Sequence, residues 1–361
     1  MTDSLLTATA PVFTVDGQVK GQLARDVSRL EIEEDTSGMK RLMLRLIAQG
    51  PQQGTPEEEV LYLNGSILDF GKRLQVSIGP EESARTVFDG FISGLQGCFH
   101  EAQEPEVVTF AEDRLMRLRT TRRMKTYEKM SDADIASAIA SEHSISAQAD
   151  ADGPTYDVVQ QWNQSDLAFL RARAHLIQAE VWIEDDKLHF QSRSGRSGTD
   201  IELVQGNTLI SAEVRADLAH QRSKVTVSGY DASSRDKISE DADSSAIDAE
   251  ISDGRTGVSI LQRAFGDRPS YRVREVPLTT GEASTWAKAE MLRRARAFVT
   301  VHGITSGTAD MVVGSHVTLQ RVGTPFEGSG YYATRILHTY DLQDGFRTHF
   351  SAERATLQEG S

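Results

Sequence analysis

Short runs of alternating hydrophobic and polar residues recur through the first 110 residues of the chain. An alternation of period two places every second side chain on the same face, which is the pattern of a half-buried β-strand. Turn signals at Asp16-Gly17 and Asn64-Gly65 separate these runs. The segment Thr86–Leu95 also predicts a strand, in which Gly90 marks a bulge or a close approach of backbone. The alternating runs are Val12–Val15, Met43–Ile47 and Leu74–Ile78.

Two helix starts follow, within residues 113–190. Ser131 and Asp134 have the spacing of a capping box, with Asp in place of the usual Glu, and they predict a helix through Ser141. Ser165 predicts the N-cap of a second helix, and Asp166 places a negative charge at the positive end of its dipole. One face of that second helix carries Leu167, Leu170, Ala174 and Ile177 at helical spacing.

Two segments predict β-hairpins. Val181–Phe190 is hydrophobic at both ends and turns at Asp185-Asp186. Near the C-terminus, alternating residues from Tyr332 onward run into the turn Asp344-Gly345 and return through Phe346–Phe350.

The segments between these elements are more polar. Gln191–Thr199 is rich in Ser, Gly and Arg and predicts a linker. Lys224–Tyr230 predicts a strand, whereas Asp231–Gly254 is so rich in Asp, Ser and Glu that we expect a mobile, solvated loop. A helix is expected over Glu282–Ala297, with Ala283, Trp286 and Ala289 near one face.

These elements predict an α+β, mainly β protein with two β-barrel domains of tube type around an α/β unit. The predicted domains are residues 1–110, 111–198 and 199–361, and the last carries an acidic loop and helix insertion over about 231–297.

Composition narrows the class of function. The net charge of −14 argues against a nucleic-acid binder, because such proteins neutralise phosphates with Lys and Arg. The single Cys98 excludes a disulfide framework, and no run reaches the ~18 apolar residues that span a bilayer. Met1-Thr2-Asp3 lacks the basic start of a secretory leader, so we expect synthesis in the cytosol and no membrane binding.

Candidate catalytic patterns fail on their spacing. Gly65, Gly71 and Lys72 resemble a phosphate loop, but five residues separate the glycines and Arg73 replaces the metal-binding hydroxyl, so a plain turn is expected. His338 and His349 lack a third ligand, and Cys98 has only His100 nearby. We therefore expect no catalytic residue, no metal and no cofactor.

One basic cluster and three tryptophans stand out. The cluster is either a solvated face or a contact for an acidic partner protein, since no aromatic ladder accompanies it for single-strand binding. The tryptophans, Trp162, Trp182 and Trp286, are expected in cores or subunit contacts. The cluster comprises Arg114, Arg117, Arg119, Arg122, Arg123 and Lys125.

The most specific motif is the Gln-x-x-x-Gln-Ser-Asp-Leu-x-Phe-Leu core at Gln160–Leu170, followed by the hairpin at Val181–Phe190. With Glu112–Leu118 before it, and Gly314–Val317 and Gly330–His338 after it, nearly the whole chain except the acidic insertion resembles the phage late-control protein D family. That family comprises baseplate hubs of contractile tails and the N-terminal hub half of type VI secretion spike proteins.

The resemblance implies a homotrimeric ring in which each chain contributes two β-barrel tube domains, matching a six-fold tail tube above and a three-fold spike below. It implies contacts with the tail tube protein, with other baseplate proteins and with a separate spike protein, because the sequence given ends soon after the second barrel. The particle is then a phage, a bacteriocin-like tail or an injection system. The candidate interface residues are Arg114, Arg117, Arg122, Trp162, Asp166, Arg171 and Trp182.

Two alternatives stay open from the sequence. One is a peripheral receptor- or carbohydrate-binding tail protein. The other is a tail-associated cell-wall hydrolase, for which Asp185 and Asp186 are unsuited, because neighbouring residues on a turn diverge.

Overall fold

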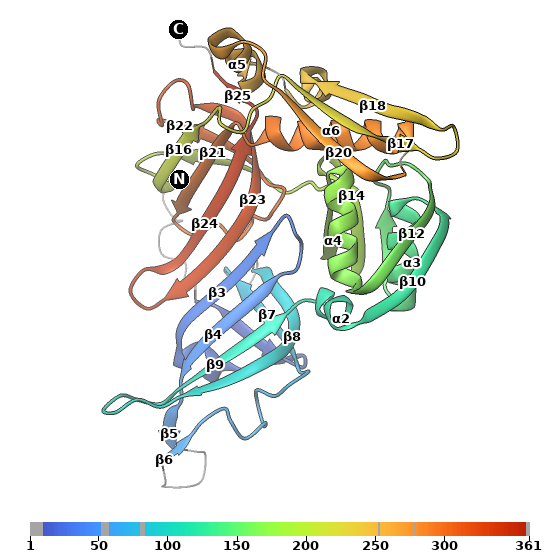
Figure 1. The fold of residues 1–361 in the computed structure, drawn as a ribbon. Helices are drawn as coiled ribbons and strands as arrows, with labels where there is room; N and C mark the ends of the chain where they lie inside the picture. Colours follow the sequence, from blue (N-terminus) through green and yellow to red (C-terminus); the bar gives the residue numbers. More distant parts are fainter. Residues whose placement is uncertain (1–9, 52–57, 80–83, 252, 278, 359–361) are drawn as a thin grey trace.

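The computed structural model describes residues 10–51, 58–79, 84–251, 253–277 and 279–358 (Figure 1). The N-terminal residues on which the expectation of no leader rested lie outside these ranges. The predicted α+β, mainly β class is confirmed. None of the described helices is long and apolar enough to cross a membrane.

The N-terminal segment is built from strands whose alternate side chains are buried. In β4, Leu42, Leu44 and Leu46 are at most 2% exposed, as the alternation of that run predicts. Gly90 lies where an added Cβ would come within 2.4 Å of the Glu112 carbonyl oxygen, which confirms the expected close approach. The elements are β1 (Val12–Val15), β2 (Gln18–Val19), α1 (Gly21–Asp26), β3 (Val27–Asp35), β4 (Arg41–Ile47), β5 (Gln49–Pro51), β6 (Glu58–Val60), β7 (Arg73–Ile78), β8 (Arg85–Cys98) and β9 (Glu106–Glu112).

The middle segment contains both predicted helix starts. The Ser131–Asp134 capping box and the Ser165 N-cap are formed, and the 181–190 hairpin turns at Asp185 and Asp186, which both have positive φ. The elements are α2 (Leu115–Thr120), β10 (Arg122–Met130), α3 (Asp132–Glu142), β11 (Ser146–Ala149), β12 (Tyr156–Ser165), α4 (Asp166–Ile177), β13 (Ala179–Glu184), β14 (Lys187–Ser192) and the 3₁₀ turn η2 (Arg193–Gly195).

The C-terminal segment holds the predicted terminal hairpin, β23–β24, and the predicted helix, α6. Its elements are β15 (Asp200–Val204), β16 (Leu209–Ala216), β17 (Lys224–Asp231), β18 (Asp236–Asp243), η3 (Ser244–Ala246), η4 (Asp248–Glu250), β19 (Arg255–Thr256), α5 (Gly257–Phe265), β20 (Pro269–Pro277), α6 (Thr280–Arg296), β21 (Val299–Thr305), β22 (His316–Gln320), β23 (Gly328–Asp341), β24 (Gly345–Arg354) and β25 (Thr356–Leu357).

One sheet of 13 strands joins the first and last segments. Its order is β16-β21-β24-β23-β3-β4-β9-β8-β7-β1-β2, with β22 attached to β23 and β15 attached to β22. The junction is the antiparallel pair β3–β23, which runs in register from Asp35 opposite Arg335 to Arg29 opposite Asp341. In Figure 1 the N-terminal strands (blue to cyan) lie below the C-terminal strands (red), and the α/β unit (green) lies at right.

Three larger hydrophobic clusters form the core. The first lies among the N-terminal strands and also includes Phe346 of β24, and the third lies among the C-terminal strands. The second fills the α/β unit, and it also includes Val227 and Ile238 of β17–β18 and Trp286 of α6. The predicted insertion therefore packs on the α/β unit, while the domain boundaries at 110/111 and 198/199 stay predictions.

Two predictions about polar segments are wrong. Asp231–Gly254 is not a loop, because β18 pairs with β17 from Lys224 opposite Asp243 to Asp231 opposite Asp236. Its charge is compatible with a strand because Asp241 pairs with Lys224 at 2.8 Å while Ile238 faces the core.

Gln191–Thr199 is not a free linker either. Strand β14 continues to Ser192, the turn η2 follows, and Arg196 is only 5% exposed. Ion pairs with glutamates from distant strands hold Arg196 in place, and the composition of this segment gives no sign of them.

Candidate interaction site

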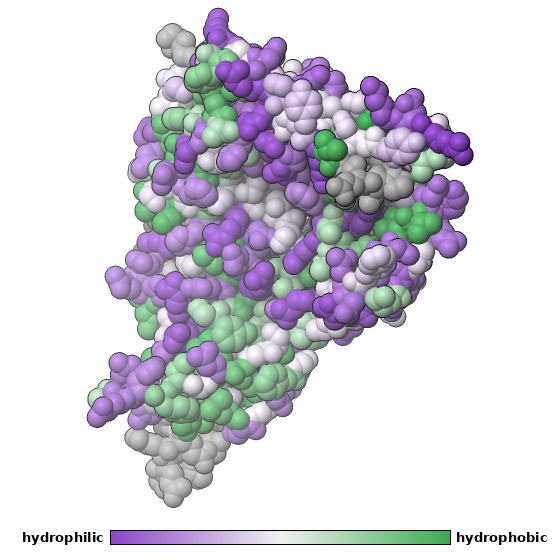
Figure 2. Space-filling model, in the orientation of Figure 1, coloured by the Kyte–Doolittle hydropathy of each residue, from purple (hydrophilic) through white to green (hydrophobic). Residues whose placement is uncertain are grey.

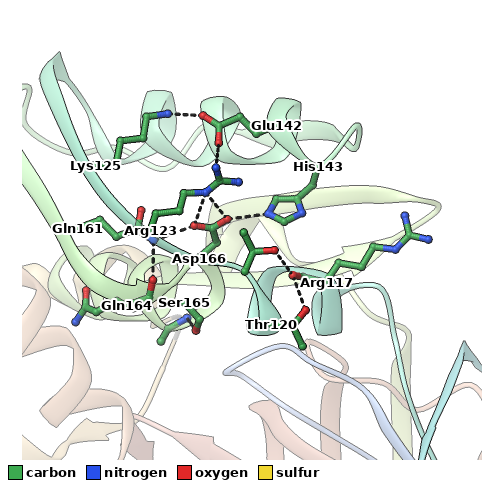
Figure 3. A network of polar contacts seen from close by, with 12 residues as sticks. Arg117, Thr120, Arg123, Lys125, Glu142, His143, Gln161, Gln164, Ser165 and Asp166 are labelled. Carbon is green, nitrogen blue, oxygen red and sulfur yellow. Dashed lines mark hydrogen bonds and ion pairs between the residues drawn. The ribbon is translucent and has the colours of Figure 1, made fainter. Parts of the chain in front are cut away.

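The motif around Asp166 forms a buried polar network, called here the Asp166 network (Figure 3). The Asp166 side chain is 0% exposed and receives Arg123 Nε at 2.9 Å and Gln161 Nε2 at 2.8 Å. The Nε2 atom of His143 lies 2.7 Å from the same carboxylate. Since a carboxylate only accepts hydrogen bonds, this His143 nitrogen carries the hydrogen. Every oxygen of the buried carboxylate is thus satisfied from within the chain.

Local sequence places Asp166 at the centre of this network. The Ser165 hydroxyl accepts the Ala168 N–H at 3.2 Å and starts α4, while the Asp166 N–H donates to the Thr121 carbonyl at 2.9 Å. Arg123 comes from β10, His143 from the end of α3 and Gln161 from β12. The Asp166 network therefore holds helix α4 against β10, α3 and β12.

A second layer of contacts surrounds the network. Glu142 pairs with Arg123 at 2.6 Å and also with Lys125, and the Tyr127 hydroxyl donates to Gln161 Oε1 at 3.1 Å. Burial, and then the charges of Asp166 and Glu142, raise the pKa of Tyr127 to about 12. The hydrogen bond to Asp166 raises the pKa of Arg123. The charged side chains of the network are therefore paired with one another, as in a structural ion-pair network.

The network supports an exposed β-ribbon. Strands β10 and β12 pair with each other and with no other described strand. Met124 and Trp162 lie opposite each other in the register and are 76% and 68% exposed, and Val158 is 56% exposed. Tryptophan and methionine are enriched at protein interfaces. With Arg122, which donates to Asn163 Oδ1 at 3.1 Å, these three residues form what we call the ribbon face.

The seven predicted interface residues do not gather in one place. Only Arg122 and Trp162 share the ribbon face. Asp166 is fully buried, and Trp182 is 3% exposed and stacks on His189 with 4.7 Å between ring centroids. Their burial leaves both residues without surface for a partner of the folded chain.

The other three candidates lie apart from the ribbon face. Arg114 pairs with Asp186 at 3.0 Å, and the Arg117 guanidinium lies 5.5 Å from the centroid of the Phe91 ring. Arg171 donates from Nε to the Ser37 carbonyl at 2.7 Å. An interface role for these residues stays a prediction.

Most of the basic cluster is paired inside the chain. Besides Arg114 and Arg123, Arg119 pairs with Glu112 at 2.5 Å and Lys125 pairs with Glu142. The cluster therefore presents much less free positive charge than its sequence indicates.

The patterns weighed for catalysis have structural roles. Lys72 Nζ donates to the carbonyls of Gly65 and Ser66, both at 2.8 Å, and so closes the turn expected there. His338 is 5% exposed and pairs with Thr348, whereas His349 lies opposite Leu337, so the two histidines are not cross-strand partners. Within the described residues, no group of three or more His, Cys, Asp and Glu side chains is arranged to hold a metal ion.

Sequence reasoning missed two hydrophobic features of the surface. Met124 is an outward hydrophobic residue on a strand whose other outward positions are polar, and this pattern was readable. Leu63, Phe99 and Phe110 are 43%, 62% and 38% exposed. A Cβ on Gly97 of β8 would come within 4 Å of Leu63 and Phe99, and one on Gly94 within 4 Å of Phe110, so the three residues lie along the β8–β9 hairpin. Figure 2 shows hydrophobic surface over the lower part of the molecule, where the N-terminal strands lie. We call these three residues the hairpin patch.

The chain superimposes on solved structures of tail proteins and of a type VI secretion component. The 43 kDa tail protein of prophage MuSo2 from Shewanella oneidensis superimposes with a TM-score of 0.70 at 15% identity, over 96% of this chain and 99% of that one. A tail protein from Neisseria meningitidis MC58 gives 0.65 at 14% identity, over 96% and 97%. The E. coli c3393 protein, described as a component of the type VI secretion system, gives 0.55 at 13% identity, over 93% and 76%. No curated protein matches the sequence.

The fold is that of these tail proteins, as the resemblance carried by the motif predicts. The profile of the family described as the Alg8 N-terminal domain matches residues 46–341, so the chain belongs to that family.

Proposed function

We propose that the protein is a structural, non-catalytic hub in the baseplate of a contractile tail-like particle. In this proposal three copies form a ring that adapts a six-fold tail tube to a three-fold spike. Its partners are the tail tube protein, a spike protein and other baseplate proteins. The likeness to tail proteins over nearly the full chain supports the class of role.

The observation that carries the proposal is the β3–β23 pair. It joins the N-terminal and C-terminal strands edge to edge in one sheet, through seven consecutive register pairs between Arg29–Asp35 and Arg335–Asp341. Each chain has one N-terminal and one C-terminal group of strands, so three chains would supply six such groups to one ring. In the proposal, neighbouring chains pair edge to edge in the same way as β3 and β23 pair within one chain.

The ends of the sheet are suited to such pairing. From Ser211 to Ala216, β16 pairs with β21 on one side, and no described strand pairs with its other side. At the opposite end the sheet finishes in the two-residue strand β2. Unpaired strand edges are templates for pairing with another chain, and ring closure removes them. We propose that β16 joins the opposite end of the next copy.

Two exposed hydrophobic surfaces are available to other proteins. The ribbon face projects from the α/β unit, and the hairpin patch lies on the N-terminal strands. We propose that these surfaces contact neighbouring baseplate and tube proteins in the assembled particle.

The ring can be tested on the purified chain by native mass spectrometry. The expected mass is that of three copies. Ile210→Lys places a charge at the exposed bulge where the free edge of β16 begins, and it should weaken trimer association at least tenfold. Leu342→Lys is the matched control, because Leu342 is 72% exposed in the β23–β24 turn, away from that edge. A monomer at every concentration, or equal effects of both variants, would contradict the ring.

The role in the particle is tested by electron microscopy of lysates with and without the gene. Loss of particles, or tubes without baseplate and spike, is the expected result. Complete, spike-tipped particles in the deletion strain would refute the hub and leave the receptor-binding and hydrolase alternatives, which glycan arrays and wall-turbidity assays separate.

A further inference from the structure

A cavity of about 370 Å³ lies where α4 and α6 approach η2 and the strands β23 and β24. Four guanidinium groups line it and only two carboxylates, so we call it the arginine cleft. Its charged lining residues are Arg171, Arg193, Arg293, Arg296, Glu180 and Glu353.

Arg171 is the key residue of the cleft. It is half-buried, its Nε donates to the Ser37 carbonyl at 2.7 Å, and its Nη2 is buried without a hydrogen-bond partner. No carboxylate lies within ion-pair distance of it among the described residues. Burial lowers the pKa of Arg171, yet an arginine keeps its charge at neutral pH. An uncompensated cation at such a place is costly unless something outside the chain pairs with it.

The neighbouring guanidiniums are compensated only in part. Arg193 pairs with Glu353 and, from its Nε at 3.9 Å, with Glu180, although this Nε has no hydrogen-bond partner. Arg296 pairs with Glu250. Glu290 is shared between Arg293 at 2.7 Å and Arg294 at 2.8 Å, so one carboxylate serves two cations. Arg293 is 45% exposed and can reorient toward a ligand in the cleft.

Helix dipoles account for part of this arrangement only. The C-terminal ends of α4 and α6 line the cleft, and cations near such ends are stabilised within the last turn. The dipole of α6 therefore explains why Arg293 and Arg296 are tolerated beside the cleft. Arg171 lies six residues before the last residue of α4, Ile177, and is outside that range.

We infer that the arginine cleft is a binding site for a carboxylate ligand. The planar guanidinium fork matches a carboxylate through two parallel hydrogen bonds, and the cleft offers several forks from different elements. A volume of about 370 Å³ is within the range of ligand pockets. It accommodates a small di- or tricarboxylate, or acidic side chains from a segment of another protein. This inference does not depend on the hub proposal.

The test is isothermal titration of the full-length chain at constant ionic strength. The probes are citrate, a glutamate-rich hexapeptide, the glutamine version of that peptide, and inorganic phosphate. Citrate or the glutamate peptide should bind saturably, and the glutamine peptide should not. Tighter binding of the peptide identifies a protein segment as the source of the carboxylate, and tighter binding of citrate identifies a free carboxylate.

Variants separate this site from general anion attraction. Arg171→Gln should weaken carboxylate binding at least tenfold, whereas Arg263→Gln, which removes an exposed arginine of α5, should leave it unchanged. Arg293→Gln tests the same site if Arg171→Gln does not fold. Absence of saturable binding by every probe, or equal affinities in the Arg171 and Arg263 variants, would overturn the inference. Phosphate binding that is insensitive to Arg171 would do the same.

Discussion

Arg196 Nη2 and Glu34 Oε1 lie 2.5 Å apart, although 162 residues separate them in the sequence. The two side chains are 5% and 9% exposed, and Arg196 Nη1 also pairs with Glu180 at 3.0 Å. The Arg196 guanidinium stacks 4.7 Å from the centroid of the Trp182 ring. This one residue therefore joins β3, β13 and the segment after η2.

Replacing Arg196 should destabilise the whole chain. Arg196→Met removes the shared cation of the buried Glu34 and Glu180, which keep only Lys40 at 3.5 Å and the Tyr332 hydroxyl and Arg193 respectively. Breaking a buried pair in this way costs about 3–5 kcal/mol of unfolding free energy. Urea unfolding followed by tryptophan fluorescence measures the change. The control is Arg85→Met, which removes an exposed ion pair with Asp310 and should cost less than about 1 kcal/mol. Equal losses in the two variants would contradict the role of Arg196.

The Asp166 network predicts that removing a buried carboxylate of the α/β unit costs more stability than removing an exposed one. Asp166→Ala removes the shared acceptor of Arg123, His143 and Gln161, and should cost about 3–5 kcal/mol. Asp157→Ala is the matched change, because Asp157 is 79% exposed beside Lys129 and should cost less than about 1 kcal/mol. Thermal unfolding by calorimetry compares them, and an Asp166→Ala protein as stable as Asp157→Ala would refute a structural role for the network.

Gly38 fixes the approach of the β3–β4 turn to β13. Its φ is +98°, and an added Cβ would lie 1.7 Å from the Val181 carbonyl oxygen. Gly38→Ala should therefore cost about 1–3 kcal/mol more unfolding free energy than a change that only strains the backbone. Gly17→Ala supplies that comparison, since Gly17 has φ +78° and open space around it. Similar urea midpoints for the two variants would show that the turn and β13 separate easily.

Buried His338 predicts a loss of stability in acid. Burial lowers the pKa of His338 from its ordinary value of 6.5 to about 3, so the folded state holds it neutral. Between these values the unfolded chain binds the extra proton. The contribution of neutral His338 to the free energy of unfolding is therefore complete above pH 6.5, and it is lost progressively as the pH falls toward 3.

The measurement is the urea midpoint as a function of pH. His338→Gln should show a shallower decline between pH 6.5 and 4 than the wild type, and His220→Gln, at an exposed position, should not. Burial raises the pKa of Asp113 to about 7, which acts in the opposite direction over part of this range and is common to all three proteins. Identical slopes in all three would contradict a neutral, buried His338.

The ribbon face predicts a change in assembly without a change in stability. Trp162 is 68% exposed, so Trp162→Ala should alter the unfolding free energy by less than about 0.5 kcal/mol. If Trp162 anchors a baseplate contact, its truncation should cost about 2 kcal/mol of binding, or roughly 30-fold. Competition with wild-type chain for incorporation into particles measures this. Phe265→Ala, at a 58% exposed position on α5, is the control, and equal incorporation of both variants would exclude the anchor role.

The sequence by itself determined the elements whose signals lie within a few residues. The Ser131–Asp134 capping box, the Ser165 N-cap and the turn at Asp185-Asp186 depend on hydrogen bonds and dihedral preferences between near neighbours. The motif at Gln160–Leu170 also indicated a tail-protein fold, which the structure then confirmed.

Only the tertiary structure decided how these elements meet. The pairing of β3 with β23 and the ion pair of Arg196 with Glu34 depend on residues more than 100 positions apart, for which no local pattern exists. The same reason explains the wrong predictions: the composition of Asp231–Gly254 favours a loop, but Ile238 gains a core and Asp241 gains Lys224 once β17 lies beside it. Burial of Asp166 likewise follows from three elements converging on one carboxylate, because buried charges are retained only where distant partners compensate them.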